Sequence, residues 1–268
     1  MQLIKLGPAG SPESSTLDGI RKVRELGLQA MEVEFVRGIG MDNELAKRCG
    51  AAAKEEDIQL SIHAPYYINL ASPEKAKRAA SKKRILMSCE RGHHLGATNV
   101  VFHAAYFMKY EKAEVYEIVK ASIKEMQAVI KQNRWDIKLA PETTGKESQF
   151  GSLEELAQLR KETGCNVCVD FAHLYARNRG IIDYANVLDF IEDRVRPKEL
   201  QCHFSGIEYT LKGEKRHENV GKHPPFEPLA KELLKRKLPA VIICESPITW
   251  KDSLNMKGIF EKLGYNFD

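Results

Sequence analysis

The chain has 268 residues, of which 43% are hydrophobic and 29% charged, a composition typical of a globular protein with its own core. Its formal net charge of +4 permits a polyanionic partner without requiring one. No apolar run approaches the roughly 20 residues of a membrane span, and the N-terminal apolar run is too short for a signal peptide, so we expect a cytoplasmic protein.

The six cysteines lie mostly in or near apolar segments. Cys165 and Cys168 have the spacing of half a zinc knuckle, but the sequence offers no matching second pair. We therefore expect reduced thiols with a structural role.

Short apolar runs alternate with amphipathic segments along the whole chain. The predicted strands cover residues 3–6, 30–35, 58–63, 99–103, 137–142, 167–170, 200–204 and 240–245. The predicted helices cover residues 15–24, 42–56, 73–95, 113–132, 152–163, 184–191, 226–236 and 252–263. Residues 206–225 form a long polar stretch without clear periodicity.

Strands that alternate with helices form parallel sheets, because each helix returns the chain to the start of the next strand. Eight repeats in a chain of 268 residues predict an α/β protein with one (β/α)8 TIM barrel domain over residues 1–268. The alternative is an open doubly wound sheet, which usually has a glycine-rich phosphate loop after its first strand. Gly7 and Gly10 do not form such a motif, so the barrel is favoured.

Six consecutive predicted strands have histidine, glutamate or aspartate as their last or next-to-last residue. Because the carboxyl ends of barrel strands converge on one face, we expect these side chains to share a cavity. Divalent metal ions would neutralise the carboxylates and use the imidazole lone pairs. The sequence therefore predicts a metal centre formed by His63, His103, Glu142, Asp170, His203 and Glu245.

Imidazole and carboxylate ligands without thiolate suit Zn²⁺, and also Mn²⁺ or Fe²⁺. His173 and His217 follow the sixth and seventh strands and are further candidates, although spacing alone leaves their role open. Eight ligands exceed the need of one ion, so we predict two or three ions, with Glu142 as the bridging carboxylate. Ions clustered in this way typically serve phosphoester hydrolysis.

Short motifs surround the strand ends in the following order: His63-Ala64-Pro65-Tyr66-Tyr67-Ile68-Asn69-Leu70, Phe102-His103, Pro141-Glu142-Thr143-Thr144-Gly145, Val169-Asp170-Phe171-Ala172-His173, Cys202-His203 and Cys244-Glu245. Together they resemble the motifs of the endonuclease IV family of apurinic/apyrimidinic (AP) endonucleases. That family is a TIM barrel with three zinc ions, and it cleaves DNA 5′ to abasic sites in base excision repair. The resemblance implies the same activity here, with a metal-held hydroxide as nucleophile, on a monomeric protein whose partner is abasic DNA.

The resemblance also implies a role for each matching residue. One zinc would be bound by His63 and His103, with Glu142 bridging to a second; Asp170, His203 and Glu245 would complete the second; His173 and His217 would bind the third. Glu142 and Glu245 would be the catalytic residues. Tyr66 would lie against DNA at the lesion, the alternative being packing over the barrel mouth, and Arg37 lies where the family inserts a DNA-penetrating loop.

The sequence departs from the family in the loop after the seventh strand. Where the family has Asp-Arg-His, this chain has Lys215-Arg216-His217. A protonated lysine cannot ligate and would repel a nearby metal ion. Glu214 is adjacent, but its register differs by one residue.

Two other functions remain open. A sugar isomerase or epimerase of the related xylose isomerase-like barrels would bind one ion such as Mn²⁺ or Mg²⁺, and Glu142, Asp170, His203 and Glu245 fit its ligand set. A homologue that binds damaged DNA without cleaving it would tolerate altered third-site ligands. The number of metal ions per chain separates the hydrolase from the isomerase, and a gel shift without turnover would indicate the binding protein.

Overall fold

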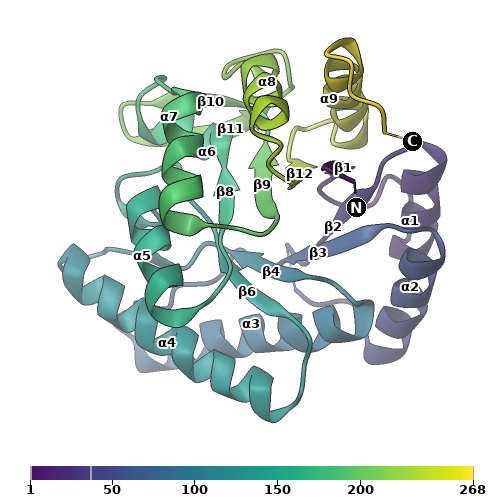
Figure 1. Cartoon of the computed structure of the whole chain (residues 1–268). Coiled ribbons are helices and arrows are strands. Elements are labelled where there is room, and N and C mark those ends of the chain that lie inside the picture. The colour runs from purple at the N-terminus through teal and green to yellow at the C-terminus, as the bar shows by residue number, and fades with distance from the viewer. Residues whose placement is uncertain (1, 37, 268) are drawn as a thin grey trace.

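The centre of the computed structural model, which describes residues 2–36 and 38–267, is a ring of parallel strands surrounded by helices (Figure 1). The strands of the ring are β1 (Ile4–Pro8), β2 (Ala30–Glu34), β3 (Gln59–His63), β4 (Asn99–Phe102), β6 (Lys138–Pro141), β8 (Cys168–Asp170), β9 (Leu200–Phe204) and β12 (Ala240–Cys244). All of them correspond to strands predicted from the sequence.

The ring is closed by hydrogen bonds between two sets of strands. One set has the order β1-β12-β9-β8 and the other has the order β2-β3-β4-β6. A parallel bridge between Glu142 and Cys168 joins β6 to β8, and a bridge between Ala9 and Glu32 joins β1 to β2. The fold is therefore the predicted TIM barrel.

Helices return the chain between successive strands on the outside of the ring. They are α1 (Thr16–Glu25), α2 (Asn43–Glu55), α3 (Lys75–Leu95), α4 (Lys112–Gln132), α5 (Leu153–Thr163), α6 (Phe171–Arg177), α7 (Tyr184–Phe190), α8 (Phe226–Arg236) and α9 (Trp250–Lys262). A π-helical turn over Ile191–Val195 extends α7. None of the helices in residues 2–36 and 38–267 is long and apolar enough to cross a bilayer.

Helix starts follow the capping residues that the sequence provides. The side chains of Ser15 and Asp42 accept hydrogen bonds from the first turns of α1 and α2. Ser152 and Glu155 form a capping box at the start of α5, and Gly164 ends that helix in the left-handed region.

Two antiparallel pairs of strands lie outside the ring, and the sequence analysis missed both. The pairs are β5 (Ala105–Tyr106) with β7 (Gln149–Phe150), and β10 (Gly206–Thr210) with β11 (Gly213–Glu218). The expectation of an irregular stretch over residues 206–225 is therefore wrong for its first half. Ile207 of β10 packs against Ala172 and Ala176 of α6, but β11 is polar throughout, so it lacks the alternation of polar and apolar residues that identifies a strand.

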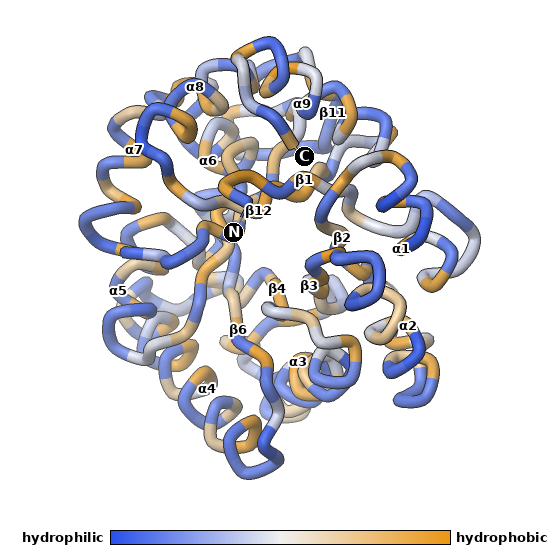
Figure 2. Tube along the Cα trace, turned by 45° about the vertical axis from the view of Figure 1, so that its right-hand side comes forward, coloured by the Kyte–Doolittle hydropathy of each residue, from blue (hydrophilic) through white to orange (hydrophobic). Residues whose placement is uncertain are grey.

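The barrel strands are buried on both faces, and β1 and β12 stand out as apolar in Figure 2. Ile242 and Cys244 of β12 belong to the large core between strands and helices. The alternate residues Val241 and Ile243 pack with Ala30 of β2 in a separate small cluster. One face of β12 thus packs in the outer core, and the other face packs in the barrel interior.

Gly7 of β1 tests how closely β1 packs against the backbone of β2. A Cβ atom there would lie 1.7 Å from the carbonyl oxygen of Ala30, which is backbone and cannot move independently of β2. We expect Gly7→Ala to lower the free energy of unfolding by about 3 kcal/mol or more, at the upper end of overpacking effects. Chemical denaturation measures the change.

The matched control is Gly258→Ala in α9, where a Cβ would meet no described atom within 4 Å. Alanine is the better helix former, so this variant should gain about 0.5–1 kcal/mol. Equal stabilities of the two variants would contradict the predicted strand contact.

Candidate metal centre

Glu142 lies at the middle of the side chains that the barrel strands bring together. Its carboxylate is fully buried directly after β6, and Oε2 lies 3.3 Å from His63 Nε2 and 3.0 Å from His103 Nε2. One ligand atom from each of these three residues lies within 4.8 Å of the others. The three side chains that the resemblance assigns to one metal position are therefore neighbours in the fold.

The second carboxylate oxygen of Glu142 faces a different group. Its Oε1 is 3.2 Å from His203 Nδ1, and the same nitrogen is 3.2 Å from Glu245 Oε1. With Asp170, these residues form a set of four whose ligand atoms lie within 4.8 Å of one another. Glu142 thus belongs to two groups through its two oxygens, which is the arrangement expected of a bridging carboxylate.

Asp170 has one structural oxygen and one that faces the site. Oδ1 accepts the backbone hydrogen bond of His173 at 2.7 Å and so caps α6, while Oδ2 is buried without a hydrogen-bond partner among the described residues. Asp170, His173 and His217 form a third group of potential ligands. The two roles of Asp170, helix cap and metal ligand, are compatible because each uses a different oxygen.

His217 reaches this third group from β11 of the hairpin. Its Nδ1 lies 2.6 Å from Ser205 Oγ, and its Nε2 lies 3.7 Å from Glu245 Oε2. The ring centroids of His217 and His173 are 5.2 Å apart. All eight ligands predicted from the sequence are therefore close to one another at the carboxyl end of the barrel.

The histidines determine the charge of the buried carboxylates. Burial by itself raises the pKa of Glu142, but the neighbouring His103 and His203 outweigh it and hold that pKa well below the usual range. The Glu245 pKa is likewise held low against burial, mainly by His203. Asp170 differs, because burial raises its pKa to about 6 despite the opposing charge of His173.

The carboxylates in turn hold protons on the imidazoles. Burial lowers the pKa of His63, yet its hydrogen bond to Glu142 and the charge of Glu34 raise the net value to about 10. The pKa values of His173 and His203 are also raised well above the usual one, against burial, by the surrounding acids. A metal ion that binds these imidazoles would therefore have to displace their protons.

These donors fit divalent cations. The buried Asp170 Oδ2 faces the group without a hydrogen-bond partner in residues 2–36 and 38–267, and the neighbouring atoms are imidazole nitrogens and carboxylate oxygens. Burial raises the pKa of the Cys168 thiol well above its usual value, so this nearby cysteine remains a thiol. The clustered residues could therefore bind metal ions through nitrogen and oxygen.

The sequence analysis missed Glu32 of β2. This residue is completely buried, with Oε1 3.0 Å from His203 Nε2, while Oε2 accepts a hydrogen bond of 2.6 Å from Ser61 Oγ. Nδ1 of His203 faces the ligand group, and Glu32 places a negative charge on the opposite side of the ring, although Glu32 Oε1 and His203 Nε2 have no hydrogen-bond partner among the described residues. A glutamate flanked by Met31 and Val33 in a buried strand was the available signal.

Glu34 is the second acid of β2 that the sequence analysis missed. It forms a further acidic group with Glu32 and Glu245, and burial together with the charge of Glu32 raises its pKa to about 8 despite the opposing charge of His63. Glu32 and Glu34 are two residues apart, so they face the same side of β2. This i, i+2 pair was the signal that the strand turns acids into the barrel.

The structure corrects the expectation that Lys215 would repel a metal ion. Its ammonium points out of the site and pairs with Glu208 Oε1 at 2.7 Å. Glu214 instead faces inward, where Oε2 lies 3.1 Å from His173 Nε2. Burial raises the Glu214 pKa, but His173 and His103 outweigh it and lower the net value, so the group is a carboxylate.

Tyr66 lies at the edge of the ligand cluster. Its ring centroid is 5.8 Å from that of His63, and the residue is 59% exposed. It lines a groove of about 640 Å³ with other residues that include Arg84, Tyr106 and Met108. Arg37, the other predicted DNA contact, lies outside the described residues.

The remaining histidines and the cysteines have structural surroundings. His93 Nδ1 accepts a hydrogen bond of 3.1 Å from the backbone of Asp136, and the ring of His223 stacks on Tyr175. All six cysteines are buried and none forms a disulfide with another. The burial of the cysteines agrees with the structural role expected for them from the sequence.

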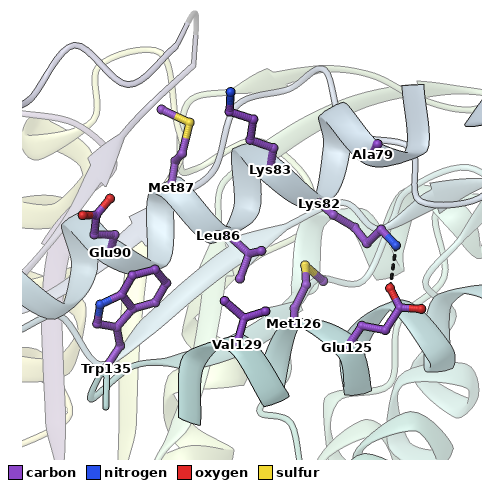
Figure 3. A pocket seen from close by; sticks show the side chains of 10 residues that line it. All are labelled: Ala79, Lys82, Lys83, Leu86, Met87, Glu90, Glu125, Met126, Val129 and Trp135. Carbon is purple, nitrogen blue, oxygen red and sulfur yellow. Dashed lines mark hydrogen bonds and ion pairs between the residues drawn. The ribbon is translucent and has the colours of Figure 1, made fainter. Parts of the chain in front are cut away.

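A separate pocket lies on the outside of the barrel between α3 and α4 (Figure 3). Leu86, Met126, Val129 and Trp135 line it, and an ion pair between Lys82 and Glu125 borders it. None of the eight predicted ligands is among the residues that line this pocket, so it is not part of the candidate centre.

Comparisons with known sequences agree with this architecture. The sequence pattern of the xylose isomerase-like TIM barrel family matches residues 20–260. A protein of Methanocaldococcus jannaschii, named only as uncharacterized, is 34% identical over 97% of this chain and 98% of its own length. A probable endonuclease 4 of Mycobacterium leprae is 26% identical over 63% of this chain, a match that spans 65% of that protein.

Solved structures share the fold at low identity. Endonuclease IV from Thermus thermophilus superposes with a TM-score of 0.75 at 19% identity, covering 97% of both chains. A D-tagatose 3-epimerase-like protein gives a TM-score of 0.70 at 18% identity, covering 96% of both chains. Since the family pattern matches residues 20–260, the chain belongs to the xylose isomerase-like TIM barrel family and has endonuclease IV among its relatives.

Proposed function

We propose that this protein is a metal-dependent AP endonuclease that hydrolyses the DNA phosphodiester 5′ to abasic sites in base excision repair. The observation that carries the proposal is the position of Glu142, whose two oxygens face two different groups of ligands. A third group begins at Asp170. Ligands for two or three ions, with Zn²⁺ favoured and Mn²⁺ possible, suit phosphoester hydrolysis better than a reaction that needs one ion.

When bound, divalent ions supply Lewis acidity, which activates water and neutralises charge on the phosphate. Glu142 would keep its two neighbouring ligand groups at a fixed separation and balance their charge. Glu245, whose side chain is 14% exposed and whose low pKa keeps it a carboxylate, would take part in catalysis by holding a cation at the open side of the centre. The exposed ring of Tyr66 would stack against an unpaired nucleotide beside these groups.

The relatives support the nature of the substrate. The mycobacterial relative is named as a probable endonuclease 4, and endonuclease IV shares the fold along nearly the whole chain. The groove beside Tyr66 also contains Lys77 and Arg84, which suit a phosphate backbone. Abasic DNA is therefore the substrate that we propose.

A sugar epimerase or isomerase is the second candidate. Glu142, Asp170, His203 and Glu245 form one compact group of four, which would suffice for a single ion. His63, His103 and His173 would then have no ligand role, although each contacts the Glu142 carboxylate. One ion per chain and epimerisation of a ketose would favour this candidate, whereas two or three ions would favour the hydrolase.

Removal of the Glu142 charge tests the proposed hydrolase directly. We expect zinc-loaded wild-type protein to nick a plasmid with defined abasic sites. Glu142→Gln should lower the rate by about 1,000-fold or more, because loss of metal assistance removes several kcal/mol of transition-state stabilisation.

The matched control is Glu147→Gln, which removes a carboxylate that is 67% exposed on the following loop. It should nick at the wild-type rate. If wild-type protein with its metal content verified leaves abasic DNA intact, the proposed activity is wrong.

Proton release tests the metal centre without any substrate. His63 keeps its proton at neutral pH because its pKa is about 10, and it must lose that proton to become a ligand. We therefore expect zinc binding to the metal-free protein to release protons and to weaken as the pH falls. Calorimetry in two buffers with different heats of ionisation measures the number of protons.

The variant His63→Gln should release about one proton fewer than the wild type. Identical heats in both buffers for the wild type would mean that zinc displaces no proton, contrary to the raised pKa of His63.

Tyr66 tests the proposed stacking contact. Tyr66→Ala should weaken binding to a duplex with an abasic site by about 1–3 kcal/mol, the usual value of one stacked base. Tyr66→Phe retains the ring and should bind as the wild type does. Fluorescence anisotropy measures both, and equal affinities for the alanine and phenylalanine variants would exclude a role of the ring.

A further inference from the structure

The β10–β11 hairpin contains an irregularity opposite Glu208 and Tyr209. Glu208 pairs with Arg216, but the next residue, Tyr209, pairs with Glu214, so Lys215 is an extra residue in β11. A β-bulge of this kind places two consecutive residues on the same side of a strand. Glu214 precedes the bulge, so it faces the side opposite to the one that regular alternation in β11 would give it.

Side-chain contacts follow this change of direction. Lys215 and Arg216 both contact the Glu208 carboxylate, at 2.7 and 3.0 Å, and both are more than half exposed. The side chain of Glu214 points the other way and is only 15% exposed. The related family has its acidic residue one position later in the sequence. The bulge turns Glu214 to the side of the strand on which that acidic residue would lie.

Two glycines allow the hairpin to approach the loop after β6. A Cβ at Gly213, whose φ is +100°, would lie 2.3 Å from the carbonyl oxygen of Gly145, and a Cβ at Gly145 would lie 2.3 Å from Glu214 Oε2. Backbone hydrogen bonds run from Glu214 N to Gly145 O at 3.1 Å and from Gly145 N to Glu214 Oε2 at 3.0 Å. Glu214 is thus held at Gly145 both through its backbone N–H and through its carboxylate.

The position of this carboxylate is next to the third group of ligands. Glu214 Oε2 lies 3.1 Å from His173 Nε2, and His173 belongs to that group with Asp170 and His217. Lys146 Nζ, at 3.4 Å from Oε1, is the cation that pairs with Glu214 on the outer side. Two imidazoles and one aspartate leave room for a fourth ligand in a tetrahedral site.

We propose that Glu214 is the carboxylate ligand that completes the third cation position with Asp170, His173 and His217. This inference rests on the metal centre proposed above. The carboxylate that the family takes from the residue at position 215 is supplied here by position 214, because the bulge at Lys215 turns that residue outward.

The experiment counts zinc ions. Metal-free protein is titrated with Zn²⁺, and bound zinc per chain is measured by calorimetry and by mass spectrometry of the desalted protein. We expect three ions in the wild type. In Glu214→Gln the first two should bind as before, while affinity for the third falls by about tenfold or more, since even indirect partners of metal ligands contribute 10–100-fold.

Lys215→Ala is the matched control, because it removes the neighbouring charge on the outer face, and it should retain three ions. If Glu214→Gln does not fold, Glu214→Asp replaces it: the shorter carboxylate withdraws from His173 and should weaken the third ion alone. Three ions bound with wild-type affinity in a folded Glu214 variant would overturn the assignment, and so would a wild type that saturates at two.

These outcomes are separate from those of the proposed function. A wild-type protein that binds three zinc ions but leaves abasic DNA intact would refute the DNA substrate and leave the role of Glu214 standing. A protein that nicks abasic DNA with only two ions would support the hydrolase and refute the role of Glu214.

Discussion

A buried carboxylate surrounded by imidazoles is the constraint around which this structure is built. Transfer of a charged group into a protein interior costs several kcal/mol unless compensating charges and hydrogen bonds are present. Glu142 is fully buried, and its oxygens contact His63, His103, His173 and His203. The carboxylate stays charged because these imidazoles surround it, and the surrounding acids in turn raise the pKa values of His63, His173 and His203 against burial. Metal cations could take the place of the protons on these imidazoles, because both supply positive charge beside the same carboxylate.

The barrel produces this arrangement because its strands are parallel and closed. Each contributing strand ends at the same rim, so residues separated by tens of positions become neighbours. The group of four ligands within 4.8 Å of one another requires no long loop, since the strand ends themselves bring the side chains together. Asp170 serves two purposes at such a strand end, because one oxygen caps α6 and the other faces the ligand group.

The third group depends on a different device. His217 and Glu214 come from a hairpin outside the barrel, and its approach depends on glycines at positions 145 and 213. Ile207 is the hairpin residue that packs in a buried apolar cluster, so the bulge and the glycines also take part in setting the register of its strands. The sequence of this hairpin departs from the related family, and the directions of its side chains could be determined only from the structure.

The sequence by itself determined the barrel and its rim of ligands, because buried parallel strands read as apolar runs and helix starts carry their own caps. His63, His103, Glu142, Asp170, His203 and Glu245 could be predicted, since a strand end identifies the rim. Only the tertiary structure decided the rest. Glu32 and Glu34 lie inside a strand, where the direction of a side chain depends on barrel closure, and the orientation of Glu214 depends on a bulge formed between two strands. The spacing of Glu32 and Glu34 indicates that they share a face of the strand, but which face turns inward is decided by pairing with distant segments.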